Sequence, residues 1–202
     1  MPRICISGSH STGKSTVINV LKEMPDLMKR FTFKTEILRD IKKTGIKINE
    51  FGSDETQMIV MAKHMEYATI PNTILDRGVL DGMVYTAYLY EKQQIKKSTL
   101  KIAEAIFENI RYDIQFYIAP EFDIVPDGVR SENTEFRDRV AELFEEYMES
   151  YRIIPIRLSG SVEQRVKQFM DTLTSYDKWI KMEAKEKAAY INELSQMYKT
   201  EV

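Results

Sequence analysis

The stretch Gly8-Ser9-His10-Ser11-Thr12-Gly13-Lys14-Ser15 has residue types and spacing that suit phosphate chemistry. It fits the pattern G-x-x-x-x-G-K-[ST], in which glycines permit a tight turn and successive backbone N–H groups surround an anion. Lys14 is expected to reach the β- and γ-phosphates of a nucleotide, and the Ser15 hydroxyl to coordinate Mg²⁺. The residues expected to bind the nucleotide in this stretch are Gly8, Ser11, Thr12, Gly13, Lys14, Ser15 and Thr16.

The segments on either side of this loop are those that a phosphate-binding loop requires. Residues 3–7 form a short β-prone run with an apolar centre, which predicts a buried strand. Residues 16–24 carry apolar side chains at helical spacing, and Pro25 ends the pattern. The positive end of that helix would add to the anion-binding loop. The sequence therefore predicts that the chain binds a nucleoside triphosphate.

Strand-like and helix-like segments alternate along the rest of the chain. This order predicts a doubly wound α/β fold, a parallel sheet with helices on both faces. Pro155 places the last strand at a sheet edge. The expected strands are 3–7, 31–38, 73–77, 113–118 and 152–158, and the expected helices are 16–24, 53–70, 79–90, 100–110, 135–150, a segment opened by a Ser161/Gln164 capping box, and 176–198.

Composition indicates a single domain over residues 1–202. Hydrophobic residues make up 43% of the chain and charged residues 30%, which is ordinary for a soluble globular protein. The formal net charge of -2 gives no indication of nucleic acid or membrane as a partner. The single cysteine, Cys5, lies in the first predicted strand, so we expect it to be buried in a reducing compartment. With no apolar run long enough to span a bilayer, the expected localisation is cytoplasmic.

Charged residues at strand ends are candidates for chemistry, because ligands of such sheets bind beyond the carboxyl ends of the strands. Asp76 and Arg77 end the third predicted strand. A carboxylate there can hold Mg²⁺ or take a proton, and an arginine can clamp a phosphate or stabilise the transferring charge. Glu36 ends the second strand and is the rival general base. Asp81, one helical turn beyond Arg77, is a weaker candidate.

The stretch of about residues 121–139 is expected to act as a lid that carries arginines. Phosphoryl transfer spreads negative charge over the equatorial oxygens, so a closing segment that supplies Arg130 and then Arg137 would suit the reaction. Of the two histidines, His10 is interpreted as a filler of the phosphate loop, and His64 as a residue on a helix surface.

These residues resemble those of the P-loop small-molecule kinases, the group that contains thymidylate kinase, the deoxynucleoside kinases and the nicotinamide-riboside-kinase domains. The resemblance covers most of the chain. Its motifs are Gly8 to Thr16, the pair Asp76-Arg77, and Asp127-Gly128-Val129-Arg130 followed by Phe136-Arg137. It implies a five-stranded sheet in the order 2-3-1-4-5.

The same resemblance implies roles for individual residues. Arg77 would bind the acceptor's phosphate, Asp76 would serve the metal or the acceptor, and the loop ending in Arg130 and Arg137 would lie over the nucleotide. Glu36 loosely matches the strand-two carboxylate that acts as base in nucleoside kinases. Gly78 departs from the tyrosine or histidine that follows Asp-Arg in thymidylate kinases, and the lid has few arginines. The resemblance therefore predicts the fold and nucleotide binding more strongly than it predicts the identity of the acceptor.

The leading interpretation is transfer of the γ-phosphoryl group of ATP, with Mg²⁺, to a hydroxyl or phosphate of a nucleoside- or nucleotide-like acceptor. A variant is a kinase acting on a hydroxyl of a modified base in DNA. The acidic pI of about 5.9 favours a small acceptor. Other classes are an NTPase switch, for which no Asn/Thr-Lys-x-Asp motif is found, and a nucleotide-binding module without activity. The lysines that would contact DNA phosphates are residues 42, 43, 47, 92, 96, 97 and 101.

Overall fold

A five-stranded parallel sheet forms the centre of the molecule. The computed structural model describes residues 2–35, 37, 41, 43, 45–121 and 133–199, and it describes side chains as far as residue 191. The strand order is β2-β3-β1-β4-β5, which confirms the predicted fold class. β1 pairs with β3 and β4, and Ile6 lies opposite Asp76 and Phe116. The strands are β1 (Arg3–Ser7), β2 (Thr32–Lys34), β3 (Thr73–Asp76), β4 (Ile114–Tyr117) and β5 (Ile156–Arg157).

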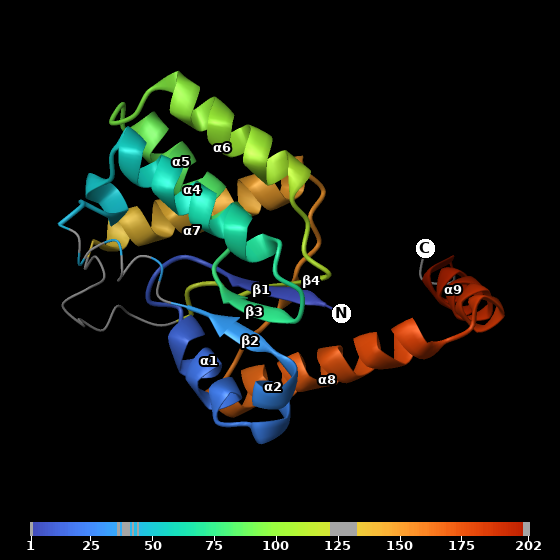
Figure 1. Cartoon of the computed structure of the whole chain (residues 1–202). Coiled ribbons are helices and arrows are strands. Elements are labelled where there is room, and N and C mark those ends of the chain that lie inside the picture. Colours follow the sequence, from blue (N-terminus) through green and yellow to red (C-terminus); the bar gives the residue numbers. More distant parts are fainter. Residues whose placement is uncertain are drawn as a thin grey trace.

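Helices cover both faces of this sheet (Figure 1). One layer contains α4 (Asp54–Ala68), α5 (Val79–Glu91), α6 (Lys97–Asn109) and α7 (Thr134–Ser150). The other contains α1 (Lys14–Lys22), α2 (Pro25–Arg30) and α8 (Val162–Lys181), while α9 (Ala184–Lys199) projects away from the body. A 3₁₀ turn, η1 (Asn49–Phe51), precedes α4.

Each helical layer packs its own hydrophobic cluster against the sheet. Val84, Phe107 and Phe144 belong to the cluster beneath α5, α6 and α7. Ile18 and Phe169 belong to the cluster between α1, α8 and the sheet. Burial on both faces agrees with the apolar strands that a parallel α/β sheet requires.

The central strand β1 is the most deeply buried element. Ile4, Cys5 and Ile6 are each 0% exposed. Burial raises the pKa of the Cys5 thiol, and the nearby Asp81 carboxylate raises it further. The thiol is therefore protonated at neutral pH, and the prediction of a buried cysteine is confirmed.

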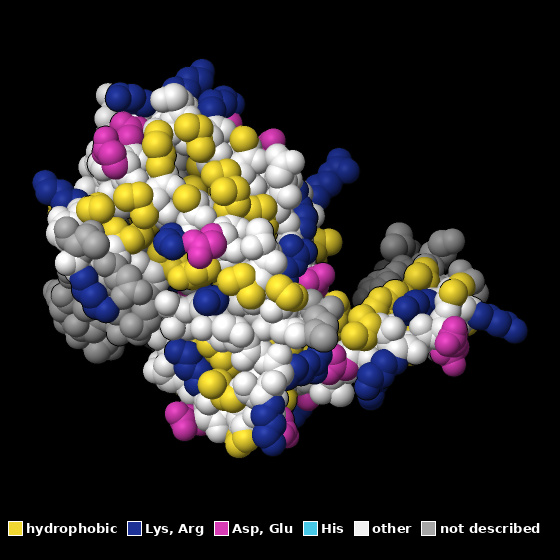
Figure 2. Space-filling view, in the orientation of Figure 1, with side chains coloured by type: hydrophobic (Ala, Val, Ile, Leu, Met, Phe, Trp, Pro, Cys, Tyr) yellow, Lys and Arg dark blue, Asp and Glu magenta, His cyan; other side chains and the backbone are white. Residues whose placement is uncertain are grey.

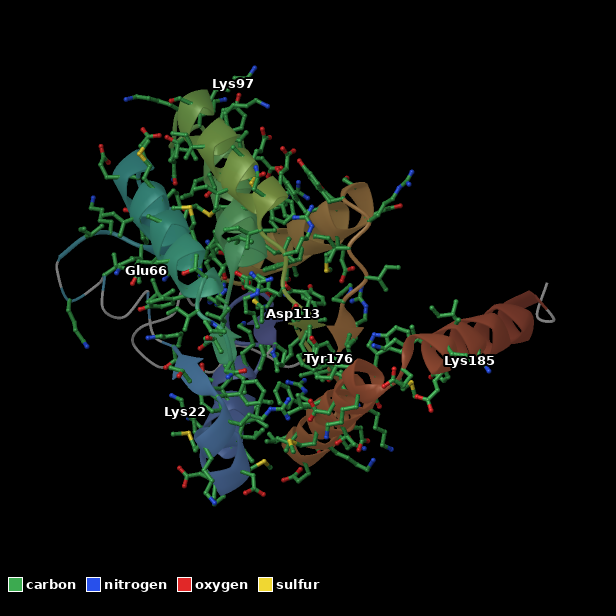
Figure 3. All side chains as sticks on the ribbon, turned by 45° about the vertical axis from the view of Figure 1, so that its right-hand side comes forward. Lys22, Glu66, Lys97, Asp113, Tyr176 and Lys185 are labelled. Carbon is green, nitrogen blue, oxygen red and sulfur yellow. The ribbon has the colours of Figure 1, made fainter. Side chains whose placement is uncertain are left out.

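Several element boundaries differ from the predictions. β2 covers only Thr32–Lys34 instead of 31–38, and β5 only Ile156–Arg157 instead of 152–158. The predicted tail helix is interrupted, because α8 ends at Lys181 and α9 begins at Ala184. Figure 3 shows Lys185 of α9 well apart from the body, whereas Tyr176 of α8 lies near Asp113.

Asp54 and Gln57 have the sequence spacing of a capping box, but the start of α4 is built differently. Ser53 is the N-cap and accepts a hydrogen bond from the Thr56 backbone N–H. The Asp54 carboxylate accepts instead from the backbone N–H of Lys96 and the hydroxyl of Thr99, at the start of α6. Asp54 thus caps the start of α6 and not the start of its own helix. None of the described helices combines the length and hydropathy that a membrane-spanning segment needs.

Candidate active site

The phosphate loop connects β1 to α1 and depends on two glycines. Gly8 has a φ of 147° and Gly13 a φ of 84°, conformations that side chains disfavour. A Cβ atom at Gly8 would lie 2.3 Å from the carbonyl oxygen of Ile118, and one at Gly13 would lie 2.9 Å from the guanidinium of Arg165. Both glycines are therefore required by the path of the backbone as well as by space.

Lys14 begins α1 and is only 5% exposed. Its ammonium donates to the carbonyl oxygen of Gly8 at 2.8 Å, to Thr12 Oγ1 at 3.0 Å and to the carbonyl oxygen of Ser9. The oxygens of the loop thus hold the cation against the wall of the cleft.

Asp81, in the first turn of α5, anchors the start of the loop. Its carboxylate accepts hydrogen bonds from Ser7 Oγ at 2.5 Å, the Gly8 backbone N–H at 3.2 Å and the Gly78 backbone N–H at 3.0 Å. It also pairs with Arg77 Nη1 at 3.2 Å. Asp81 is 1% exposed, and four donors surround its oxygens. This weaker candidate for chemistry is thus a structural part of the loop.

Arg77 follows β3 with a positive φ of 75°, a strained conformation for a residue with a side chain. Its Nη1 donates to the Gly8 carbonyl oxygen at 3.0 Å, and its guanidinium lies 5.1 Å from the centre of the Tyr85 ring. Burial opposes the charge, but Tyr85, Asp81 and Asp76 together raise the pKa of Arg77 above its usual value. The Gly8 carbonyl therefore accepts from two permanent cations, which makes this end of the cleft attractive to anions.

A cleft of about 140 Å³ brings part of the predicted site together, whereas Gly8, Thr16 and Arg137 do not line it. The predicted residues that line it are Ser11, Thr12, Gly13, Lys14, Ser15, Asp76 and Arg77. The phosphate loop forms one wall, and Asp76 and Arg77 approach from the carboxyl end of β3, as the rule for parallel sheets predicts. Other residues that line it are Ile18, Asn19, Lys22, Thr35, Ile37, Ile48, Asn49 and His64.

His64 also lines this cleft, so the prediction that it lies on a helix surface is wrong. The side chain is 3% exposed, because α4 turns Gln57, Val60, Met61 and His64 inward. The spacing of the methionines and alanines in the sequence predicts a different apolar face for this helix, formed by Met58, Met61, Ala62, Met65 and Ala68. In the structure, Met58 and Met65 are 41% and 44% exposed. Burial lowers the pKa of His64 to about 3, and the charge of Arg77 contributes to the shift.

Arg165, in α8, supports the phosphate loop from behind. It is 2% exposed, and its Nη1 donates to the carbonyl oxygen of Thr12 at 2.7 Å. Its Nη2 pairs with Glu121 at 3.0 Å, and the same carboxylate accepts from the Gly160 backbone N–H. Sequence reasoning missed this residue. Its partner Thr12 lies 153 positions away, and no local pattern marks the contact.

The predicted lid is described only in part. Glu36, Asp127 and Arg130 lie outside the described residues, so their roles stay predictions. Arg137 is buried in the first turn of α7, and its Nε donates to Asp138 at 3.0 Å. The His10 ring stacks on Phe136 with ring centres 5.0 Å apart, which joins the start of α7 to the phosphate loop.

The cleft has side chains that fit a magnesium ion. Ser15 and Asp76 both line it and would offer a hydroxyl and a carboxylate oxygen, the ligand type that Mg²⁺ prefers. Within the described residues, no group of three or more His, Cys, Asp or Glu side chains could hold a metal. An ion bound here would therefore take further oxygens from the nucleotide phosphates.

A family model described as AAA domain matches residues 3–165 of the chain. A search of curated protein sequences found no significant match. Several solved structures share the fold at low sequence identity. One is a deoxyadenosine kinase from M. mycoides with dCMP and dCDP bound, which is 15% identical, covers 85% of this chain and 98% of its own, and has a TM-score of 0.64. A second is the NadR protein in complex with NAD and AMP-PNP, at 16% identity, with 89% of this chain and 50% of NadR covered and a TM-score of 0.63. A third is a thymidylate kinase from Ehrlichia chaffeensis, at 15% identity, with 84% of this chain and 97% of the kinase covered and a TM-score of 0.56.

At identities this low, the TM-scores of 0.56 to 0.64 show a shared fold and nothing beyond it. The present chain spans about half the length of NadR and nearly all of the two kinases. The expected resemblance to P-loop small-molecule kinases is confirmed at the level of the fold.

Proposed function

The chain belongs to the AAA domain family, and we propose that it transfers the γ-phosphoryl group of ATP to a hydroxyl or phosphate of a nucleoside- or nucleotide-like acceptor. The observation that supports this most is the shared cleft, in which Lys14 and Ser15 face Asp76 and Arg77. Phosphoryl transfer depends on positioning and on neutralising charge, and these residues suit both tasks.

The phosphate loop would bind the nucleotide through its backbone N–H groups and Lys14. The three oxygens that hold Lys14 in the loop would give way to phosphate oxygens, which are stronger acceptors because they are charged. Mg²⁺, held by Ser15 and Asp76, would neutralise charge on the phosphates.

The acceptor would approach from the β3 side of the cleft. Asp76 is the proposed general base for an attacking hydroxyl, and Glu36 remains the alternative. Arg77 would face the transferring group or an acceptor phosphate. Arg130 and Arg137 are proposed to supply further positive charge from the lid.

A small acceptor is favoured over DNA by the surroundings of the exposed lysines. Around the α5–α6 turn, Lys92 lies 3.9 Å from Glu135 and Lys96 lies 4.0 Å from Asp54, while Lys101 is paired with Glu104 at 2.6 Å. On the face drawn in Figure 2, Lys and Arg side chains are interspersed with acidic and apolar ones instead of forming one stripe. Lys42 lies outside the described residues.

The proposal is tested by ADP release with Mg²⁺–ATP and a panel of acceptors: deoxyadenosine, thymidine, thymidine monophosphate, nicotinamide riboside, and duplex DNA containing 5-hydroxymethyluracil. We expect one small acceptor to stimulate ADP release, with a KM that changes little between low and moderate salt. Stimulation by DNA alone, with a steep loss of affinity in salt, would contradict the small acceptor. ADP release that no acceptor stimulates would contradict the kinase.

A further inference from the structure

A small recess opens beside the cleft, between α4 and α5. Its volume is about 20 Å³, and Gln57, His64, Arg77, Gly82 and Tyr85 are among its lining residues. Asn49, His64 and Arg77 also line the main cleft, so the recess continues from it. Space of this size holds one water molecule or one small polar group, and no larger part of a ligand.

His64, a lining residue of the recess, carries a polar atom that the described protein leaves unsatisfied. The Nδ1 atom of His64 is buried and makes no hydrogen bond to any described residue. Its ring is held against Gly82, where an added Cβ would lie 3.1 Å from His64 Cδ2 and 2.3 Å from Met61 Sδ. A buried polar group without a partner destabilises a fold, and such a group in a native protein calls for an explanation.

The recess offers little formal charge to a ligand. Arg77 is the only Lys or Arg among its described lining residues, and its Nη1 is engaged with Gly8 and Asp81. The Asp81 carboxylate is surrounded by four donors. The His64 imidazole is neutral at pH 7, because its pKa is lowered to about 3. A neutral imidazole carries one hydrogen-bond donor and one acceptor.

We infer that the recess binds an uncharged polar substituent of a planar nitrogen heterocycle in the acceptor, such as an exocyclic amino, carbonyl or hydroxymethyl group, and that His64 recognises it by a hydrogen bond. This inference rests on the proposed function. It divides the cleft into an anionic-ligand end at the phosphate loop and a neutral-ligand end at His64. The heterocycle itself would lie in the main cleft, with only its substituent in the recess.

The kinetic test compares His64→Leu, His64→Gln and the neighbouring surface control Met65→Leu, using the acceptor panel above. His64→Leu should raise the KM of the productive acceptor about tenfold, the contribution of one buried hydrogen bond, with kcat within about threefold of wild type. His64→Gln, which can still hydrogen-bond, should recover part of the loss. The KM for ATP should be unchanged in all three.

A stability measurement separates recognition from a structural role. Because Nδ1 has no partner in the described protein, His64→Leu should leave the melting temperature unchanged or raise it. A raised acceptor KM in a variant of undiminished stability supports the inference. An unchanged acceptor KM would overturn it while the proposed kinase activity stood.

A binding measurement decides the case in which no panel member is phosphorylated. The chain has only two histidines, so the imidazole ¹⁵N resonances can be assigned with the His64→Leu variant. We expect uncharged nucleosides, and not Mg²⁺–ATP alone, to shift the His64 resonances. If no nucleoside shifts them at millimolar concentration, the inference is wrong, whichever way the turnover assay falls.

Discussion

The charged side chains at the phosphate-loop end of the cleft and the neutral imidazole at the His64 recess differ in whether the protein supplies their hydrogen-bond partners. At the loop, Lys14 and Arg77 donate to loop carbonyl oxygens, and Asp81 accepts from four donors. In the recess, His64 Nδ1 has no partner among the described residues. Charged side chains such as Lys14 can be held by hydrogen bonds within the protein until phosphate oxygens replace those partners. The neutral His64 imidazole, in contrast, would gain a hydrogen-bond partner for Nδ1 only when the ligand binds. The first arrangement stabilises the protein, and the second costs stability for the sake of binding.

The largest effect is expected at the loop. Lys14→Ala should lower phosphoryl transfer by at least about two to three orders of magnitude, because the ammonium stabilises charge on the transferring group. The fold should remain, since the lysine's partners are oxygens of its own loop and not of the core. Single-turnover transfer from labelled ATP measures the effect, with Lys29→Ala as the exposed control. Turnover near the wild-type level in Lys14→Ala would mean that the loop does not serve catalysis.

Two carboxylates compete for the role of general base. We expect Asp76→Asn to lower kcat by roughly two to four orders of magnitude, and Glu36→Gln to act mainly on particular acceptors. The reason is that Asp76 lines the cleft beside Arg77 and Ser15. Steady-state kinetics of both variants with each acceptor provide the measurement. A mild effect of Asp76→Asn beside a severe effect of Glu36→Gln would reverse the assignment.

Removing the loop's anchor should affect stability more than chemistry. Asp81→Ala leaves the buried Arg77 unpaired and three donors without their acceptor, so we expect the free energy of unfolding to fall by about 3–5 kcal/mol. Urea denaturation measures the loss, and Asp171→Ala, which removes an exposed ion pair with Lys167, serves as the control. A loss below about 1 kcal/mol would show that the network around Asp81 is not what holds the loop.

The smallest effect is a pH dependence that the recess predicts. The folded-state pKa of His64 is lowered to about 3, so between pH 3 and the ordinary value of about 6.5 the unfolded chain binds the extra proton. Stability must therefore fall as the pH falls below 6.5, by about 1 kcal/mol from pH 7 to 5.5. Urea midpoints at the two pH values should differ more for wild type than for His64→Leu. If the urea midpoint changed equally with pH in wild type and in His64→Leu, the pH dependence would come from residues other than His64.

The sequence predicted the parts of the site whose signals are local. The glycines and the lysine of the phosphate loop occur within eight positions, and the strand and helix around them have clear periodicities. Asp76 and Arg77 followed from the rule that ligands bind at the carboxyl ends of parallel strands. The sheet order required the resemblance to known kinases, because spacing alone does not determine which strands are neighbours.

Long-range contacts explain why Arg165 was missed and why Asp81 was predicted only as a weaker candidate for chemistry. Arg165 reaches Thr12 from the far end of the chain, and Asp81 reaches back to Ser7 across the sheet. His64 was misplaced because the methionines suggested a different buried face of α4. The face that is buried, at positions 57, 60, 61, 64 and 68, has equally good helical spacing but includes two polar residues, Gln57 and His64, which line the recess.

The central claim is that one cleft passes the γ-phosphoryl group from ATP to an acceptor, and the destination of that group tests it most directly. Wild-type protein is incubated with ATP labelled at the γ-phosphorus, Mg²⁺ and the acceptor that most stimulates ADP release, and the products are separated. The account predicts label on the acceptor in equal amount to the ADP formed, and none on the acceptor with Lys14→Ala. Label that appears only as inorganic phosphate would contradict it and indicate an NTPase instead.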